Sequence, residues 1–596
     1  MRDFIKYALA SVVGFALFSA LSFGSLIAII VAIASRDAGP EVEDKTILVL
    51  DLGVNIADTQ PTLGTEEALE RALVGDGERI LPLRMVLRSL EAAATDDRIV
   101  GLYIKGTPGS MPTGQANLEE VRNAIDAFRA SEKPIYAYDR DWTESEYYLA
   151  SAATLLMMDP LGAMEFNGIA SEVMFLGEAF DRYGVGVQVV RAGAYKSAVE
   201  PFTRNNFSDE ARSQLQGTVE DLWRELRVSV AANRPIDAVQ LQTLASSRGI
   251  LLAQEAVNAQ VIDEVATDND VVQKLQELSE VDEEDKPFRG MSISEYASTA
   301  EIFKDELEIA TDDNRIAIIY ARGPIVDGEG GLQQIGGDSF AKIFRKLRQE
   351  EDVKAIVLRI DSPGGSALAS EVIKRELELT KEVKPVIVSM GNVAASGGYW
   401  IAMSGDRIYA NPNTITGSIG VFGLLLNVQE LANEYGINWD VVKTNPLADL
   451  ESLSRPKTAR EIQILQNFVN LVYERFITEV ARTRNMERSQ VEDIAQGKIW
   501  SGTAARDIGL VDELGGLDVA VNAAAERAEL GEDWVIEEYP KASSFEIQLL
   551  ENLFGSDTND PLSQQWQQVR EQVQDLATFN DPSGVYSKMP YRLELR

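Results

Sequence analysis

Short apolar runs and longer stretches of helical periodicity alternate along most of this chain. In its second half, short apolar runs predict strands near Ile316–Tyr320, Ala355–Ile360 and Val386–Ser389. Helical stretches between and after them predict helices near Ser339–Glu350, Ala367–Glu382 and Ala459–Thr483. This alternation is typical of βαβ units, so we expect an α/β protein with a mostly parallel sheet covered by helices.

The longest apolar run lies near the N-terminus. Tyr7–Ala34 is a stretch of 28 residues without a charged side chain. As a helix it would be about 42 Å long, enough to span a bilayer with some tilt. The apolar core of a cleaved signal peptide is only about 7–15 residues long. We therefore expect one transmembrane anchor at residues 7–34, with cleavage after Ala32-Ile33-Ala34 as the alternative.

The charges that flank this run predict its orientation. Arg2 and Lys6 precede it, whereas Asp37, Glu41 and Glu43 follow it. By the positive-inside rule, the N-terminus faces the cytoplasm and the rest of the chain lies outside. No second long apolar run follows in the sequence, so we expect a single-pass protein.

The chain also repeats itself. Residues 98–110 read RIVGLYIKGTPGS and residues 354–366 read KAIVLRIDSPGGS, in both cases an apolar strand followed by a Gly/Pro turn. Further matches follow in the same order: Lys133-Pro134 with Lys384-Pro385, Asp159-Pro160 with Asn411-Pro412, Val189-Val190 with Val441-Val442, and Val261–Val265 with Leu510–Leu514. Their order indicates a duplicated domain of about 250 residues.

These matches predict the domain organisation. The expected parts are the cytoplasmic tip and anchor (1–36), a first repeat (45–278), an acidic linker (279–313), a second repeat (314–540) and a C-terminal helix and tail (541–596). The tail is rich in Gln and Asn, and its amphipathic stretch Ser563–Phe579 predicts the terminal helix.

Composition then excludes several kinds of chemistry. The 596 residues include no His and no Cys, which excludes Ser-His-Asp triads, Cys nucleophiles, disulfides and zinc sites built on thiolate or imidazole. A general base must be Lys, Asp, Glu or Tyr, and we expect neither a metal nor a cofactor. With 56 Lys and Arg against 94 Asp and Glu, the net charge of −38 argues against nucleic-acid binding.

Small residues gather at three predicted strand ends of the second repeat. These clusters are Asp361–Ser366, Asn392–Tyr399 and Thr416–Gly420. Ligands of α/β sheets bind at the carboxyl ends of strands, and backbone N–H groups of such turns can form an oxyanion hole. Ordinary turns are the alternative, but the clusters occupy corresponding points of successive βα units, which favours a site.

Ser396 is the candidate nucleophile. It follows a short strand and two alanines, and Gly-Gly-Tyr-Trp after it opens a helical stretch. A helix N-terminus favours developing negative charge, and small neighbours let a substrate backbone approach closely. An N-cap serine is the alternative role, and one serine can fill both.

Comparison of the repeats indicates Lys196 as the candidate base. In the alignment, Ala448 stands opposite Lys196, and Ser145 stands opposite Ser396. Ser145 lies between Glu144 and Glu146 and has no glycines beside it, which makes a poor oxyanion environment, so each repeat holds only half of such a pair. Burial among small apolar neighbours would lower the pKa of Lys196 and let its neutral amine deprotonate Ser396, with Ser418 orienting the amine. The alternative is that the copies drifted independently and Lys196 is a surface lysine.

Three segments together resemble a known family. Ala394–Trp400, Thr416–Gly420 and Tyr195–Phe202 are similar to motifs of bacterial signal peptide peptidase A, in its long two-repeat form that is also called protease IV. The resemblance covers the anchor, both repeats and the linker. It implies tandem ClpP/crotonase-like domains and a serine peptidase that degrades cleaved signal peptides and other apolar peptides.

The resemblance also implies roles and surroundings. It implies Ser396 as nucleophile, Lys196 as base, and backbone N–H groups of Gly364, Gly365 and Gly397 as the oxyanion hole. It further implies a homotetramer in the bacterial inner membrane, with periplasmic catalytic domains. Two other functions remain open from the residues: an acyl-CoA enzyme of the crotonase type, and a catalytically silent membrane scaffold.

Overall fold

The computed structural model describes most of the chain. The described residues are 41–59, 80–107, 113–281, 287–299, 314–331, 333–531, 533–540, 581 and 584–589. The predicted anchor at residues 7–34 and the predicted helix at Ser563–Phe579 lie outside these ranges. Within them, no helix is long and apolar enough to cross a membrane.

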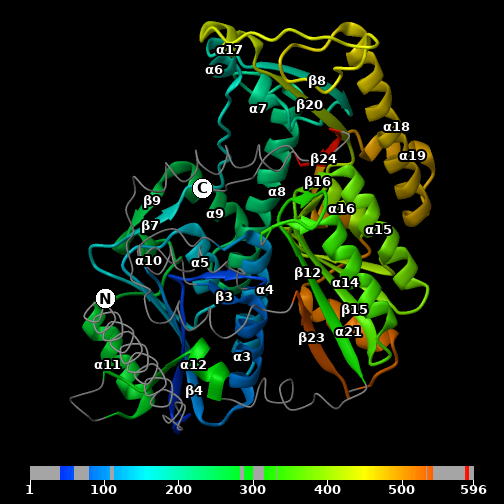
Figure 1. Cartoon of the computed structure of the whole chain (residues 1–596). Coiled ribbons are helices and arrows are strands. Elements are labelled where there is room, and N and C mark those ends of the chain that lie inside the picture. Colours follow the sequence, from blue (N-terminus) through cyan, green and yellow to red (C-terminus); the bar gives the residue numbers. More distant parts are fainter. Residues whose placement is uncertain are drawn as a thin grey trace, which may run out of the picture.

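The first repeat is built on a six-stranded parallel sheet (Figure 1). Its strand order is β10-β6-β5-β4-β1-β11. The bounds are β1 Thr46–Asp51, β4 Ile99–Lys105, β5 Ile135–Asp139, β6 Leu155–Met158, β10 Glu264–Val265 and β11 Gly290–Ser292. Helices α3 (Leu83–Thr95) and α4 (Gln115–Arg129) cover one face, and α11 (Asp268–Ser279) covers the other.

Burial of both faces explains the apolar runs of this sheet. In β1, Leu48 and Leu50 pack in the core that contains α3 and α4. Their neighbour Ile47 points the other way and packs with Leu275 of α11. Because successive strand residues face opposite sides, a strand covered on both sides needs a nearly continuous apolar run.

Part of the segment expected as a linker belongs to this sheet. Residues 290–299, inside the predicted linker 279–313, form β11 and α12 (Ile293–Thr299). β11 pairs in parallel with β1, and Tyr296 of α12 is buried in the first core. Three apolar side chains in an acidic context, Met291, Ile293 and Tyr296, are enough to anchor this strand and helix.

The second repeat has the same strand order as the first, β22-β18-β17-β15-β12-β23, which confirms the predicted duplication. The bounds are β12 Arg315–Arg322, β15 Val353–Ser362, β17 Val386–Ala395, β18 Arg407–Ala410, β22 Glu513–Leu514 and β23 Val535–Tyr539. Helices α14 (Gly337–Gln349), α15 (Ala367–Lys381) and α18 (Ala459–Arg484) share one core, and α21 (Leu517–Arg527) covers the other face. The predicted strands and helices of this repeat are therefore present, with shifted ends.

Strand β17 is longer than predicted because it changes partner midway. Its residues 387–390 pair with β18, and its residues 393–395 pair with β19 (Ile415–Gly417). The antiparallel strand β21 (Ile499–Ser501) then pairs with β19. As a result, β17 ends beside β19, directly before Ser396.

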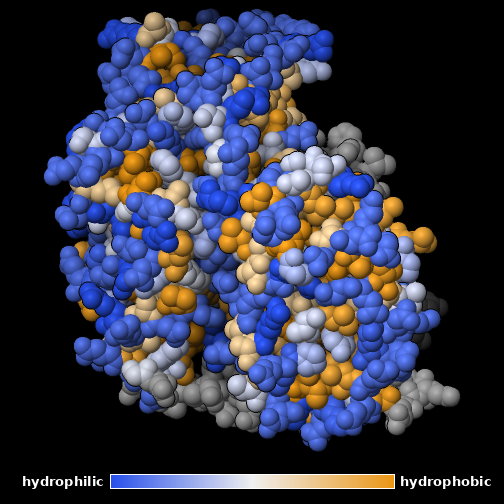
Figure 2. Space-filling model, turned by 180° about the vertical axis from the view of Figure 1, so that it is seen from behind, coloured by the Kyte–Doolittle hydropathy of each residue, from blue (hydrophilic) through white to orange (hydrophobic). Residues whose placement is uncertain are grey.

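A third sheet joins the two repeats, in the order β14-β13-β16-β24-β20-β8. The bounds are β8 Gly186–Ala192, β13 Ile325–Val326, β14 Ile335–Gly336, β16 Gly364–Ser366, β20 Val421–Asn427 and β24 Tyr586–Lys588. Strand β8 comes from the first repeat, β24 from the tail and the others from the second repeat. Figure 1 shows β8 and β20 beyond the two main sheets, and Figure 2 shows this end projecting from the body of the molecule.

The remaining elements complete the described fold. In the first repeat they are β2 Asn55–Ala57, β3 Ile80–Pro82, β7 Ala163–Phe166, β9 Gly249–Leu252, α5 Glu144–Ala150, α6 Gly177–Arg182, α7 Glu200–Thr203, α8 Asp209–Asn233, α9 Ala238–Ser247 and α10 Ala253–Asn258. In the second they are α16 Gly397–Ala402, α17 Gln429–Glu434, α19 Arg488–Ile494 and α20 Gly502–Asp507.

A buried ion-pair cluster fixes the two repeats to each other. Arg359 of β15 is fully buried, and its guanidinium lies 2.9 Å from the carboxylate of Asp58 and 2.8 Å from that of Glu120, both in the first repeat. Glu120 also accepts hydrogen bonds from Asn411 and from the backbone of Leu517 in the second repeat. Removal of one partner from a buried charge pair is costly, because it leaves the other charge buried without compensation.

Candidate active site

Ser396 stands at the turn between β17 and α16, as the sequence predicted. Its backbone has φ 58° and ψ −112°, a conformation that non-glycine residues rarely adopt. The turn is held by the N–H of Ser396, which donates to the carbonyl of Gly417 over 2.8 Å. The side chain makes no cap hydrogen bond to α16, so its hydroxyl is not used as an N-cap. Such strain is often found at functional positions.

Glycines after Ser396 let the backbone pack closely against the rest of the site. A methyl group on Gly398 would lie 2.7 Å from the carbonyl oxygen of Ser362. A methyl group on Gly397 would lie 2.7 Å from the hydroxyl of Ser370. Because real Cβ atoms do not come so close to other atoms, only glycine fits at these two positions without a shift.

Lys196 reaches the site from the first repeat, on the loop between β8 and α7. The N–H of Tyr195 donates to the carbonyl of Gln496 over 2.9 Å, which ties this loop to the second repeat. The amide of Gln214 in α8 donates to the carbonyl of Tyr195 and accepts from the N–H of Ile499. Lys196 itself is fully buried.

The amine of Lys196 meets two serines. Its Nζ atom lies 2.6 Å from Oγ of Ser396, and 2.9 Å from both the carbonyl oxygen and Oγ of Ser418. Burial holds the pKa of Lys196 well below its ordinary value. A neutral amine has two N–H donors and one lone pair, so it can donate twice to Ser418 and accept the Ser396 proton. The structure thus brings together all three side chains that the sequence singled out.

The glycines expected to form an oxyanion hole lie beside Ser396, on β16 and at the start of α16. Gly364 has φ 91°, and its Cα lies 3.1 Å from the position of a Cβ on Gly397. The N–H of Gly364 donates to Oγ of Ser362 over 3.2 Å, so it is not free to bind an oxyanion. Gly365 and Gly397 therefore remain as the candidate backbone donors among the three glycines.

The equivalent position in the first repeat has a different environment. Ser145 lies in α5, where Thr143 and Glu146 form a capping box. Burial raises the pKa of Glu146 to about 7. Without glycines beside it and without a lysine partner, Ser145 lacks the surroundings that Ser396 has.

Ser587 in β24 is a residue of the site that the sequence analysis missed. Its Oγ lies 2.7 Å from Oγ of Ser396 and donates to the carbonyl of Gly420 over 3.4 Å. The signal in the sequence is weak: the residues Asp-Pro-Ser-Gly at 581–584 favour a turn, and the pair Val585-Tyr586 after them favours a strand.

Comparison with known proteins identifies the family of this chain. The model of the family described as Peptidase family S49 matches residues 127–282 and 378–531, one segment in each repeat. The chain is 33% identical to Protease 4 of Haemophilus influenzae over 95% of both chains. It is 34% identical to Protease 4 of Salmonella typhi over 91% of this chain and 89% of the relative. It is 32% identical to a putative signal peptide peptidase of Enterococcus faecium over 41% of this chain and 72% of the relative. The chain belongs to peptidase family S49.

Proposed function

We propose that this protein is a membrane-anchored serine endopeptidase that degrades cleaved signal peptides and other apolar peptides with a Ser-Lys dyad. The observation that carries this proposal is the 2.6 Å separation of Lys196 Nζ and Ser396 Oγ in a fully buried environment. A buried amine with a lowered pKa is the base that a serine needs in a chain without histidine.

The proposed reaction passes through an acyl-enzyme. Lys196 accepts the hydroxyl proton of Ser396 as Oγ attacks the peptide carbonyl carbon. The same proton then moves to the leaving amine as the C–N bond breaks, which leaves an ester on Ser396. Water attacks this ester, Lys196 accepts its proton, and Ser396 is regenerated. Ser418 holds the amine in place during both steps through two hydrogen bonds.

Backbone N–H groups of Gly365 and Gly397 would stabilise the oxyanion that forms in each step. Gly397 follows Ser396 in the chain, and Gly365 pairs with Ser587, whose hydroxyl contacts Ser396. Neither glycine carries a side chain that would keep a carbonyl oxygen away. Fixed donors of this kind typically contribute about 3–4 kcal/mol each to transition-state stabilisation.

Apolar peptides suit the walls of this site. Ala198, Val199 and Phe422 form one buried apolar cluster beside the catalytic groups. Ala395, Ile415 and Ile499 form another. The core of a signal peptide is apolar, and the Enterococcus faecium relative is named a putative signal peptide peptidase.

The anchor proposal rests on the sequence. Tyr7–Ala34 is long enough to span a bilayer, and the flanking charges place the N-terminus in the cytoplasm. The catalytic repeats would then lie on the periplasmic side of the bacterial inner membrane, close to where signal peptides are left after export.

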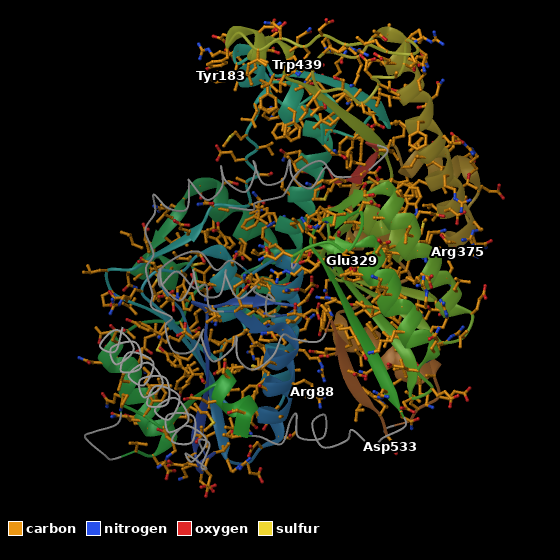
Figure 3. The ribbon with its side chains drawn as sticks, viewed as in Figure 1. Arg88, Tyr183, Glu329, Arg375, Trp439 and Asp533 are labelled. Atoms are coloured by element: carbon orange, nitrogen blue, oxygen red, sulfur yellow. The ribbon has the colours of Figure 1, made fainter. Side chains whose placement is uncertain are left out.

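An exposed apolar segment of the second repeat supports the proposed homotetramer. β8 of the first repeat pairs with β20 of the second. In the sequence alignment, the counterpart of β8 in the second repeat contains Val441-Val442, but residues 437–443 form no strand and Val442 is 99% exposed. Figure 3 shows Trp439 of this segment at the projecting end, where Tyr183 also lies. Pairing of this segment with another chain would build a head-to-tail ring.

Activity measurements on three variants test the proposal. Wild type, Ser396→Ala, Lys196→Ala and the control Ser145→Ala are assayed on an apolar peptide ester and a synthetic signal peptide in detergent. We expect loss of hydrolysis in the first two variants and full activity in Ser145→Ala, because Ser145 is the matched serine of the other repeat. Full activity in Ser396→Ala or Lys196→Ala would contradict the proposal.

A further inference from the structure

The tail strand β24 lies where a peptide would have to bind to be cut. It sits between β16, which carries Gly364 and Gly365, and β20. It runs antiparallel to both strands. Strand addition of this kind is a common way in which proteins bind extended peptides.

The register places one peptide group of β24 at the catalytic serine. Gly365 stands opposite Ser587, and Gly364 stands opposite Lys588. The flanking backbone bonds run from Met589 N–H to the Pro363 carbonyl (2.6 Å) and from Ala367 N–H to the Val585 carbonyl (3.3 Å). Hydrogen-bonded pairs alternate along an antiparallel ladder, so Gly365 and Ser587 occupy a hydrogen-bonded position.

The carbonyl of Ser587 therefore points towards Gly365 on β16, and its oxygen lies close to Gly364 and Gly397. A methyl group on Gly397 would lie 2.9 Å from this carbonyl oxygen, and one on Gly364 would overlap with it. The side chain of Ser587 contacts Oγ of Ser396 as well. Ser587 thus has the position of the residue whose carbonyl carbon is attacked.

Neighbouring side chains of the tail fill the apolar clusters beside the site. Tyr586 packs with Phe422, with ring centroids 6.0 Å apart, and belongs to the cluster of Ala198 and Val199. Met589 belongs to the cluster of Ala395, Ile415 and Ile499. The tail thus carries an apolar or aromatic side chain on each side of the Ser587–Lys588 bond.

A further contact holds the tail at the start of α15. The carboxylate of Asp581 accepts hydrogen bonds from Oγ of Ser366 and from the N–H of Leu368. The hydroxyl of Tyr586 accepts the N–H of Asp581 over 3.1 Å. The segment is therefore bound on both its backbone and its side chains.

We propose that the enzyme cuts its own C-terminal tail at the Ser587–Lys588 bond; this inference rests on the proposed peptidase function. Oγ of Ser396 attacks the carbonyl carbon of Ser587, and Lys196 takes the hydroxyl proton. The C–N bond to Lys588 breaks, and the backbone nitrogen of Lys588 receives that proton and becomes the new α-amino group. Water then hydrolyses the ester, which leaves a new C-terminal carboxylate on Ser587 and releases residues 588–596.

The purified full chain tests this by intact-mass spectrometry over time, with hydrolysis of an apolar peptide ester measured in the same sample. We expect the wild-type mass to fall by the mass of residues 588–596, less one water. Ser396→Ala is expected to keep its full length. Lys588→Pro is also expected to stay uncut, because it changes the attacked bond into a link to proline. The pair Gly364–Lys588 is a non-hydrogen-bonded pair of the ladder, so this substitution removes no hydrogen bond between β24 and β16.

The outcomes separate the two proposals. Ester hydrolysis together with a wild-type chain of unchanged length would overturn self-cleavage and leave the peptidase function standing. A cut at another bond, or the same cut in Ser396→Ala, would also overturn it. Loss of both activities would point to failure of the peptidase proposal itself.

Dilution tests whether the cut occurs within one chain. The tail and Ser396 belong to the same chain, so we expect the rate of cleavage per molecule to stay the same on dilution. A rate per molecule that is proportional to the protein concentration would contradict cleavage within the chain.

Discussion

The Nζ atom of Lys196 lies 2.6 Å from the Oγ atom of Ser396, although 200 positions separate the two residues in the sequence. Lys196 belongs to the first repeat and Ser396 to the second, so neither repeat holds the pair alone. The loop of Lys196 is held by the second repeat, through the bond from Tyr195 N–H to the Gln496 carbonyl. The gene duplication has thus produced two copies that supply different halves of one site.

The pH dependence of hydrolysis should report the state of Lys196. Only the neutral amine can accept the proton of Ser396, so kcat/KM is expected to rise with pH through the pKa of Lys196. Because burial lowers this pKa, the midpoint of the rise should lie well below the value of about 10.4 for a free lysine. A midpoint near that of free lysine would contradict a buried neutral base.

Ser418 is expected to act by positioning the amine. Ser418→Ala removes one of the two acceptors that hold Lys196 Nζ but keeps the backbone carbonyl. We expect kcat to fall by about 10-fold to 100-fold with little change in KM, since a small misplacement of a reacting group is costly. Ser404→Ala, which alters another buried serine outside the site, is the control. Equal activity of the two variants would argue against the positioning role.

Stability measurements should detect the cost of burying Lys196. The relevant pH range lies between the lowered pKa of Lys196 in the folded chain and its ordinary pKa in the unfolded chain. In this range the unfolded chain binds a proton that the folded chain does not. The free energy of unfolding of wild type therefore gains as much as about 1.4 kcal/mol per pH unit in this window, relative to Lys196→Met. As the pH rises from 7 to 10, we expect the free energy of unfolding of wild type to increase relative to that of Lys196→Met. A difference that does not change with pH would contradict the lowered pKa.

The joint between the repeats should depend on Arg359. Arg359→Met would leave the buried carboxylates of Asp58 and Glu120 without their cation. We expect a loss of about 3–5 kcal/mol in the free energy of unfolding, and lower peptidase activity because the repeats carry the two halves of the site. Arg88→Met, which breaks an exposed ion pair with Glu91, is expected to cost at most about 1 kcal/mol. Similar losses in both variants would contradict the role of the cluster.

Much of the fold and the central pair could be predicted from the sequence for physical reasons. Buried strands such as β12 and β15 are mostly apolar runs, and the order of the repeat matches fixes their equivalence. The pairing of Lys196 with Ser396 could be proposed because the absence of histidine leaves few bases. It also rests on the repeats: Lys196 has no lysine counterpart in the second repeat, and the counterpart of Ser396, Ser145, has no glycines beside it.

Other features depend on contacts that local sequence does not encode. β8 has the pattern of an ordinary strand, and nothing in it shows that its partner is β20 of the other repeat. β24 has only three residues, and it is stable as a strand because β16 and β20 flank it. Arg359 could have been noticed as a charged residue inside the predicted strand Ala355–Ile360, but its partners Asp58 and Glu120 lie far away in the sequence.

Labelling of Ser396 by a fluorophosphonate tests the account most directly. The rate of adduct formation is measured at neutral pH by peptide mass spectrometry for wild type and for Lys196→Arg. Arginine retains a positive charge but cannot act as a base at this pH. The account predicts one adduct, on Ser396, with labelling slowed by about 10²–10⁴-fold in Lys196→Arg. An adduct on a different serine, or equal labelling rates in the two proteins, would contradict it.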